Sequence, residues 1–96
     1  MERGRDFPFT IRLTGDAARL VRETHFHPSQ KVDPLPGGEG EVLFSAQASG
    51  LRSIARWVLS FGGEAEALSP PELRRYVMEK LGKATEAYGT HRGVTG

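Results

Sequence analysis

In the segment from Phe7 to Thr14, every second residue is a large apolar one. The apolar residues are Phe7, Phe9, Ile11 and Leu13, and those between and after them are Pro8, Thr10, Arg12 and Thr14. A two-residue period is typical of a β-strand with one buried face and one face toward water. The chain is therefore expected to contain a sheet with one face in the core, and the remaining elements decide which sheet it is.

Length and composition limit what this sheet can belong to. A chain of 96 residues has room for one domain, which buries roughly 60 to 65% of the surface of its unfolded chain. The absence of cysteine excludes disulfides, thiolate zinc sites and thiol catalysis. The N-terminus shows no signal peptide or membrane span, so we expect a soluble cytoplasmic protein. A net charge of +1 makes direct DNA binding a poor interpretation.

The first half of the chain continues with a helix and a hairpin. After the start signal Thr14-Gly15-Asp16, apolar spacing predicts a helix over 17–24, which ends before Pro28. Residues 30–35 form a weak strand that contains Pro34, and residues 36–40 read as a turn. Residues 42–48 alternate again, so the two strands are predicted to form a hairpin whose proline-bearing arm lies at a sheet edge.

The second half is predicted to be helix, strand and helix. The segment SGLRSIARWVLSFGG has one apolar face, with Ser49 as a candidate N-cap and Gly62-Gly63 as the end. Residues 64–68 form a short alternating strand. Ser69-Pro70-Pro71-Glu72 resembles a capping box that opens a third helix. The apolar stripe of this helix is Leu73, Tyr76, Val77, Leu81, Ala84 and Tyr88.

The order β-α-β-β-α-β followed by a helix predicts an α+β fold, a ferredoxin-like sandwich with a four-stranded antiparallel sheet in the order 4-1-3-2 and a C-terminal helix. We expect a lead-in over 1–6, one domain over 7–88 and a disordered tail over 89–96. At the two edges, Pro34, Glu64 and Glu66 are residue types that block edge-to-edge pairing. The uncovered sheet face would expose Leu43 among polar residues and await cover by the third helix or a second subunit.

Two segments resemble a known family. ARWVLSFGGEAEALSPPELRRYVMEKL, residues 55–81, is similar to the end of the C-terminal extension (WCX) domain that follows the WYL domain in bacterial transcriptional regulators. FTIRLTGDAARLVRETHFHPSQ, residues 9–30, resembles the first strand, first helix and His-Pro-Ser-Gln junction of the same family. The resemblance extends over residues 7–88.

The resemblance implies a non-enzymatic regulatory and dimerisation module, ferredoxin-like in fold, in a regulator whose helix-turn-helix domain reads DNA and whose WYL domain senses a ligand or nucleic acid. Neither of those domains, nor a Trp-Tyr-Leu tripeptide, occurs in this sequence. The expected partners are a second copy, through a sheet face or edge or through Trp57 and the third helix, and other domains of the same regulator. DNA would be reached only indirectly, and no membrane is involved. Both a fragment and a free-standing remnant fit this interpretation.

The stretch THFHPSQ is the most suggestive chemically, because His25 and His27 could share a face as metal ligands. A zinc site needs three or four ligands, and a third is hard to find near them. Ser29 has no nucleophile elbow and no obvious orienting acid. We therefore predict no metal, no cofactor and no catalytic site, and a structural junction made by His27, Pro28, Ser29 and Gln30.

Arginines provide the other candidate sites. Candidate interface or anion-binding residues are Arg12, Arg52, Arg56, Trp57, Arg74 and Arg75. Guanidinium groups suit carboxylates and phosphates, although a solvated helix face explains exposed arginines equally simply. An alternative function is thus a free-standing, ACT-like small-molecule or anion sensor that uses Arg12, Arg52 or Arg56. An RNA-recognition motif would need aromatic residues on the open sheet face, but EVLFSAQA supplies one phenylalanine, which is in phase with the apolar buried positions. An acylphosphatase would need an asparagine, and the chain contains none. Target genes, effector, dimer interface and the role of His25 and His27 stay open.

Overall fold

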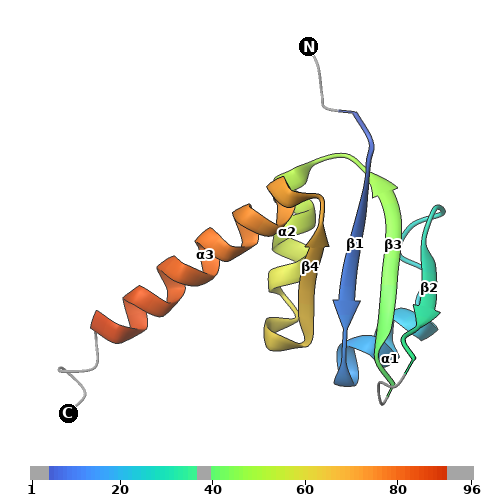
Figure 1. Ribbon diagram of the computed structural model, residues 1–96, viewed down its shortest axis with the longest axis horizontal. Coiled ribbons are helices and arrows are strands. Elements are labelled where there is room, and N and C mark those ends of the chain that lie inside the picture. The colour runs from blue at the N-terminus through green and yellow to red at the C-terminus, as the bar shows by residue number, and fades with distance from the viewer. Residues whose placement is uncertain (1–4, 37–39, 91–96) are drawn as a thin grey trace.

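The computed structural model describes residues 5–36 and 40–90. Its elements, in chain order, are β1 (Phe7–Leu13), α1 (Gly15–Glu23), β2 (Lys31–Pro34), β3 (Val42–Ala48), α2 (Leu51–Leu59), the 3₁₀ turn η1 (Gly62–Glu64), β4 (Ala65–Ser69) and α3 (Pro71–Thr90). The sheet is antiparallel in the order β2-β3-β1-β4, with α1 and α2 behind it and α3 extending away beside β4 (Figure 1). The predicted α+β ferredoxin-like fold and strand order are confirmed.

The core lies between the sheet and the helices α1 and α2. Central strand β1 pairs with β3 from Phe7↔Ala48 to Leu13↔Val42, so the apolar residues of both strands fall on the same face. The fully buried side chains, in order of volume, are Phe44, Ile11, Leu13, Leu73, Val21, Val42 and Val58. The alternation in the sequence therefore predicted correctly which face of the sheet is buried.

Helix α1 begins with a cap that comes from a distant part of the chain. The side chain of Thr14 makes no capping bond. Instead, Glu64 Oε1 accepts a 2.9 Å hydrogen bond from the Ala17 amide, and the Glu64 carbonyl accepts one from the Thr14 amide. The buried face is Ala17, Ala18 and Val21. Leu20, one of the apolar residues whose spacing predicts this helix, is 44% exposed, and Ala18 is buried instead.

Helix α2 has the predicted inward face, with Ile54, Ala55 and Val58 buried, but its ends differ from the prediction. The N-cap is Gly50 at φ +89°, not Ser49, because the chain turns sharply from β3 into the helix and only glycine adopts that conformation freely. The helix ends at Leu59, before Gly62 and Gly63, which belong to η1.

The two edge strands are short. β2 carries Pro34 at one sheet edge, as predicted, while residues 37–39 of the expected turn lie outside the described part. β4 begins at Ala65, so the prediction that Glu64 and Glu66 share one strand is wrong. Glu64 belongs to η1 and turns toward α1, and only Glu66 lies on the sheet.

Helix α3 begins one residue later than a Ser69 cap would require. Ser69 ends β4, and the Pro70 carbonyl accepts the amides of Leu73 and Arg74, so Ser69 does not cap the helix. The helix continues to Thr90, beyond the predicted end of the domain, and the remaining predicted tail, 91–96, lies outside the described residues. No helix in the described ranges is long and apolar enough to cross a membrane.

The first half of α3 is anchored and its second half is not. Leu73 and Val77 are buried against the domain, whereas every residue from 78 to 89 is exposed. Figure 1 shows the helix leaving the sheet edge instead of crossing the open sheet face. Of the two expected covers for this face, the third helix or a second subunit, α3 does not cover it, because its main contacts are with β4 and α2.

Gly15 lies against the Glu64 carboxylate that caps α1, and a substitution at Gly15 tests the importance of this contact. Its φ is +61°, and a Cβ there would lie 2.6 Å from Glu64 Oε2. We expect Gly15→Ala to lower the free energy of unfolding by about 1–2 kcal/mol, because it strains the backbone and displaces the carboxylate. Urea denaturation followed by fluorescence of the sole tryptophan measures this change.

Gly82→Ala is the matched control, since Gly82 lies in the exposed part of α3 with no atom within 4 Å of the added Cβ. It should leave the free energy of unfolding unchanged or raise it by up to about 1 kcal/mol. Equal destabilisation by both substitutions would contradict the assigned role of Gly15.

Candidate functional site

The THFHPSQ stretch forms a hydrogen-bonded junction between α1 and β2. Gln30 Oε1 accepts the amides of Phe26 (2.6 Å) and His27 (3.1 Å), and Gln30 Nε2 donates to the Thr24 carbonyl (3.1 Å). One side chain therefore satisfies three backbone groups, the carbonyl of the C-cap residue Thr24 and two amides of the loop that follows α1.

Ser29 ties this junction to the sheet. Its Oγ accepts the Gln47 amide at 2.8 Å and donates to the Gln47 carbonyl at 3.2 Å, while His27 Nδ1 lies 2.9 Å from the same Oγ and accepts the Ser29 amide at 3.1 Å. Backbone groups thus occupy the serine hydroxyl. Among the described residues, no group of three or more histidine or acidic side chains is placed to hold a metal ion.

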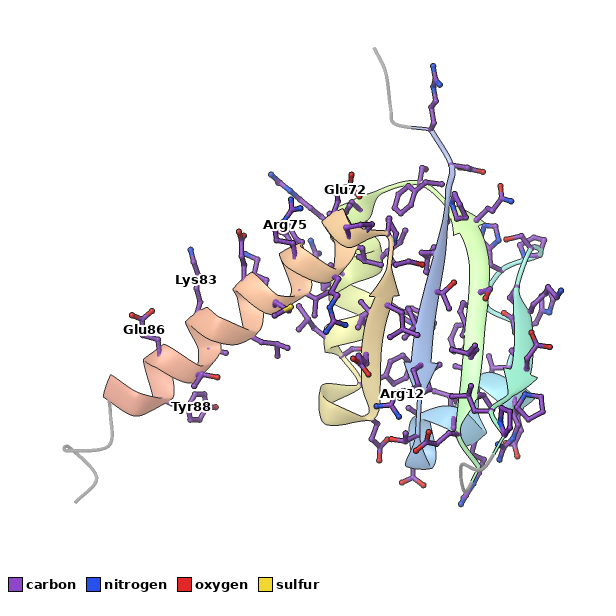
Figure 2. All side chains as sticks on the ribbon, viewed as in Figure 1. Arg12, Glu72, Arg75, Lys83, Glu86 and Tyr88 are labelled. Carbon is purple, nitrogen blue, oxygen red and sulfur yellow. The ribbon has the colours of Figure 1, made fainter. Side chains whose placement is uncertain are left out.

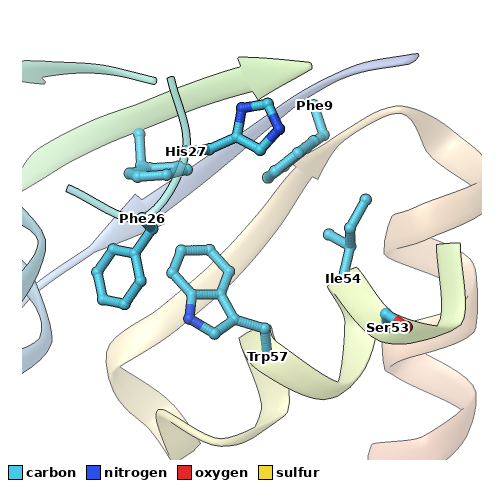
Figure 3. Close-up of a pocket in the computed structure, with 7 residues that line it drawn as sticks. Phe9, Phe26, His27, Ser53, Ile54 and Trp57 are labelled. Carbon is cyan, nitrogen blue, oxygen red and sulfur yellow. The ribbon is translucent and has the colours of Figure 1, made fainter. Parts of the chain in front are cut away.

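The junction also forms one wall of an aromatic hollow of about 220 Å³. In Figure 3, Phe26 and His27 reach into it from the junction, and Ile54 and Trp57 from α2. The centroid of the Trp57 ring lies 5.2 Å from the ring centroid of Phe26 and 5.1 Å from that of Phe44. Phe26 is 41% exposed. Among the described residues, no arginine, lysine or acidic side chain lines this hollow, and most of its lining is aromatic or aliphatic, so it suits apolar groups.

On the open sheet face, Arg12 is the centre of an ion-pair network. Its guanidinium bonds Glu41 Oε1 at 3.1 Å and Glu66 Oε1 at 3.0 Å, and Glu66 Oε2 accepts Arg74 Nη1 at 3.1 Å. Hydrogen bonds from Arg74 and Arg12 lower the pKa of Glu66 below its ordinary value of 4.5. Hydrogen bonds to Glu66 and Glu41 raise the pKa of Arg12. Carboxylates already occupy both arginines, so neither is a free anion-binding group.

A groove between α2 and α3 holds the other pair of predicted arginines. Arg52 and Arg56 line a hollow of about 230 Å³ together with Leu59, Tyr76 and Lys80. The Lys80 ammonium lies 5.4 Å from the centre of the Tyr76 ring. This groove brings three cations together and has no acidic side chain among the described residues that line it.

Arg74 and Arg75, two of the predicted interface or anion-binding residues, line one hollow together with Pro71, Met78 and Glu79. Arg74 also contacts β4, where Nη1 donates to the Ala67 carbonyl at 2.9 Å. Arg75 is exposed. Figure 2 shows Arg75 away from Arg12, on the outer side of α3.

A comparison with protein-family models matches residues 5–85 to the WCX domain. The chain belongs to the WCX domain family. The match extends over most of the chain, from the start of β1 to the exposed half of α3. A search of curated proteins found no match.

In this WCX domain, two sets of interactions between polar residues were not predicted from the sequence. Glu41 and Glu66 join Arg12 across the sheet, and Lys80 and Tyr76 join the α2 arginines. The spacing of Tyr76 and Lys80, one helical turn apart, is a signal that they share a face. No local pattern pairs residue 12 with residue 66, since only the strand order brings them together.

The ion-pair network predicts a pH-dependent stability. We expect Glu66→Gln to lower the free energy of unfolding by up to about 1 kcal/mol near neutral pH, because the exposed carboxylate loses two guanidinium partners. The folded-state pKa is lowered, so this contribution is present above 4.5 and is lost as the pH falls through the lower folded value. Urea denaturation at a series of pH values measures the difference between the two chains.

The control is Glu79→Gln, which removes the same charge from the exposed face of α3 and should change stability much less at neutral pH. A difference between the parent and Glu66→Gln that stays constant from neutral to strongly acidic pH would contradict the assignment.

Proposed function

We propose that this WCX domain is a non-enzymatic regulatory and dimerisation module of a WYL-type bacterial transcriptional regulator. Membership of the WCX family supports the regulatory part of the proposal. The exposed apolar side of α3 is the observation that carries the dimerisation part.

The second half of α3 has an amphipathic surface without a partner in the described chain. Met78, Leu81 and Tyr88 are 56%, 49% and 82% exposed. Figure 2 shows Tyr88 on the side of the helix opposite Lys83 and Glu86. A helical segment as short as this second half of α3 is marginal in water when it has no tertiary contacts, and burial of its apolar residues would stabilise it.

A second copy of α3 suits this surface. Leu81, Ala84 and Tyr88 recur at intervals of three and four residues, the spacing of helix pairs that pack side by side. Between residues 78 and 90, two lysines and two glutamates balance, so two copies would meet without net charge repulsion. Ala84 is small and permits close approach of the two backbones.

The junction supports the non-enzymatic part. The Ser29 hydroxyl, which lies beside the His27 ring, both donates to and accepts from the backbone of Gln47. A nucleophile needs a base that removes its proton and a free path to a substrate. Here the hydroxyl holds β3 against the junction instead.

Self-association through α3 gives a direct prediction. The mass measured by light scattering should rise with concentration from 10.5 kDa toward that of two chains. Leu81→Lys should weaken this dimer by about tenfold or more, because a lysine ammonium replaces a leucine that would be buried.

Ala87→Lys is the matched control, since it adds the same charge on an exposed position of α3 away from the Leu81 side. It should leave the dimer unchanged. A parent chain that stays monomeric at high concentration, or a Leu81→Lys chain that dimerises like the parent, would contradict this interface.

A further inference from the structure

The groove between α2 and α3 brings together three positively charged side chains, of which Lys80 lies over the Tyr76 ring. Arg52 and Arg56 stand one turn apart on α2, and Lys80 faces them from α3. In the described ranges of the chain, neither arginine forms an ion pair or a hydrogen bond through its side chain. This differs from Arg12 and Arg74, which both bind Glu66.

The walls of the groove complete a pocket for an anion attached to a small organic group. Leu59 and the ring of Tyr76 supply apolar surface beside the three cations. Guanidinium forks donate paired hydrogen bonds to oxyanions, and an ammonium adds a third positive charge. Mutual repulsion of these cations would be relieved by a bound anion, and a phosphoryl dianion with three terminal oxygens matches them better than a single carboxylate does.

We propose that the α2–α3 groove binds the phosphoryl group of a small phosphorylated metabolite through Arg52, Arg56 and Lys80. The site lies beside the first half of α3, before the helix extends away from the domain. A bound ligand would therefore link α2 to the first half of α3. The proposal goes beyond dimerisation and depends on residues outside the Leu81 side of α3.

Inorganic pyrophosphate is the probe, titrated into the labelled chain at constant ionic strength and followed by amide chemical shifts. Saturable shifts should appear in α2 and in the first half of α3. Arg52→Gln and Arg56→Gln should each weaken binding by about tenfold or more, since each removes a charge-assisted donor pair. Lys80→Met should weaken it without altering α2.

Arg75→Gln is the matched control, because it removes one positive charge from an exposed position of α3 outside the groove. It should change the dissociation constant by less than about twofold, the effect of a distant screened charge. Equal weakening by Arg75→Gln and Arg56→Gln would show attraction by overall charge and overturn the site.

Two other results would overturn the proposal. One is the absence of saturable shifts with pyrophosphate, and the other is tighter binding of malonate, a dicarboxylate of similar size, than of pyrophosphate. The same titration on the Leu81→Lys chain separates the two proposals, because binding there should persist whether or not the chain dimerises. Circular dichroism of each variant checks that it folds.

Discussion

The structure depends on the strict alternation of β1 at the centre of the sheet. Ile11 and Leu13 are fully buried, and Arg12 between them points to the opposite face. Because β1 pairs with β3 on one side and β4 on the other, a shift of one residue in its register would bury a guanidinium and expose the core. The same alternation places Arg12 within reach of Glu41 and Glu66. One strand thus fixes both the apolar layer and the polar network on its far side.

Periodic segments of the sequence predicted the elements well, and caps and ends were predicted poorly. The inward residues of β1, β3 and α2 follow directly from spacing, because burial of a face leaves a regular signal. The start of α1 could not be predicted in the same way. Its cap is Glu64, 47 residues away, which reaches Ala17 only after η1 brings the chain back. The nearby serines predicted as N-caps, Ser49 and Ser69, do not cap the helices. The chain enters α2 through Gly50, and the Pro70 carbonyl accepts the first amide hydrogen bonds of α3.

The candidate sites divide along the same line. The arginines are candidates by residue type, and residue type alone does not reveal which of them a carboxylate neutralises. The strand order places Arg12 beside Glu66, and the start of α3 places Arg74 beside the same carboxylate. Arg52 and Arg56 keep their charges free because the facing residues of α3 are Tyr76 and Lys80. Tertiary placement therefore decides which cations are available to a ligand.

Helix α2 separates two surfaces of opposite chemistry. Trp57 faces the aromatic hollow with Phe26, whereas its neighbour Arg56 faces α3, since adjacent residues on a helix point in different directions. The junction matters here because Gln30 holds the backbone of Phe26, so the histidine-rich stretch shapes the hollow more than it supplies chemistry. A ligand in the cationic groove would contact the side of α2 that meets α3. Any change in how α3 leaves the domain would therefore reach the exposed Leu81 side through one continuous helix.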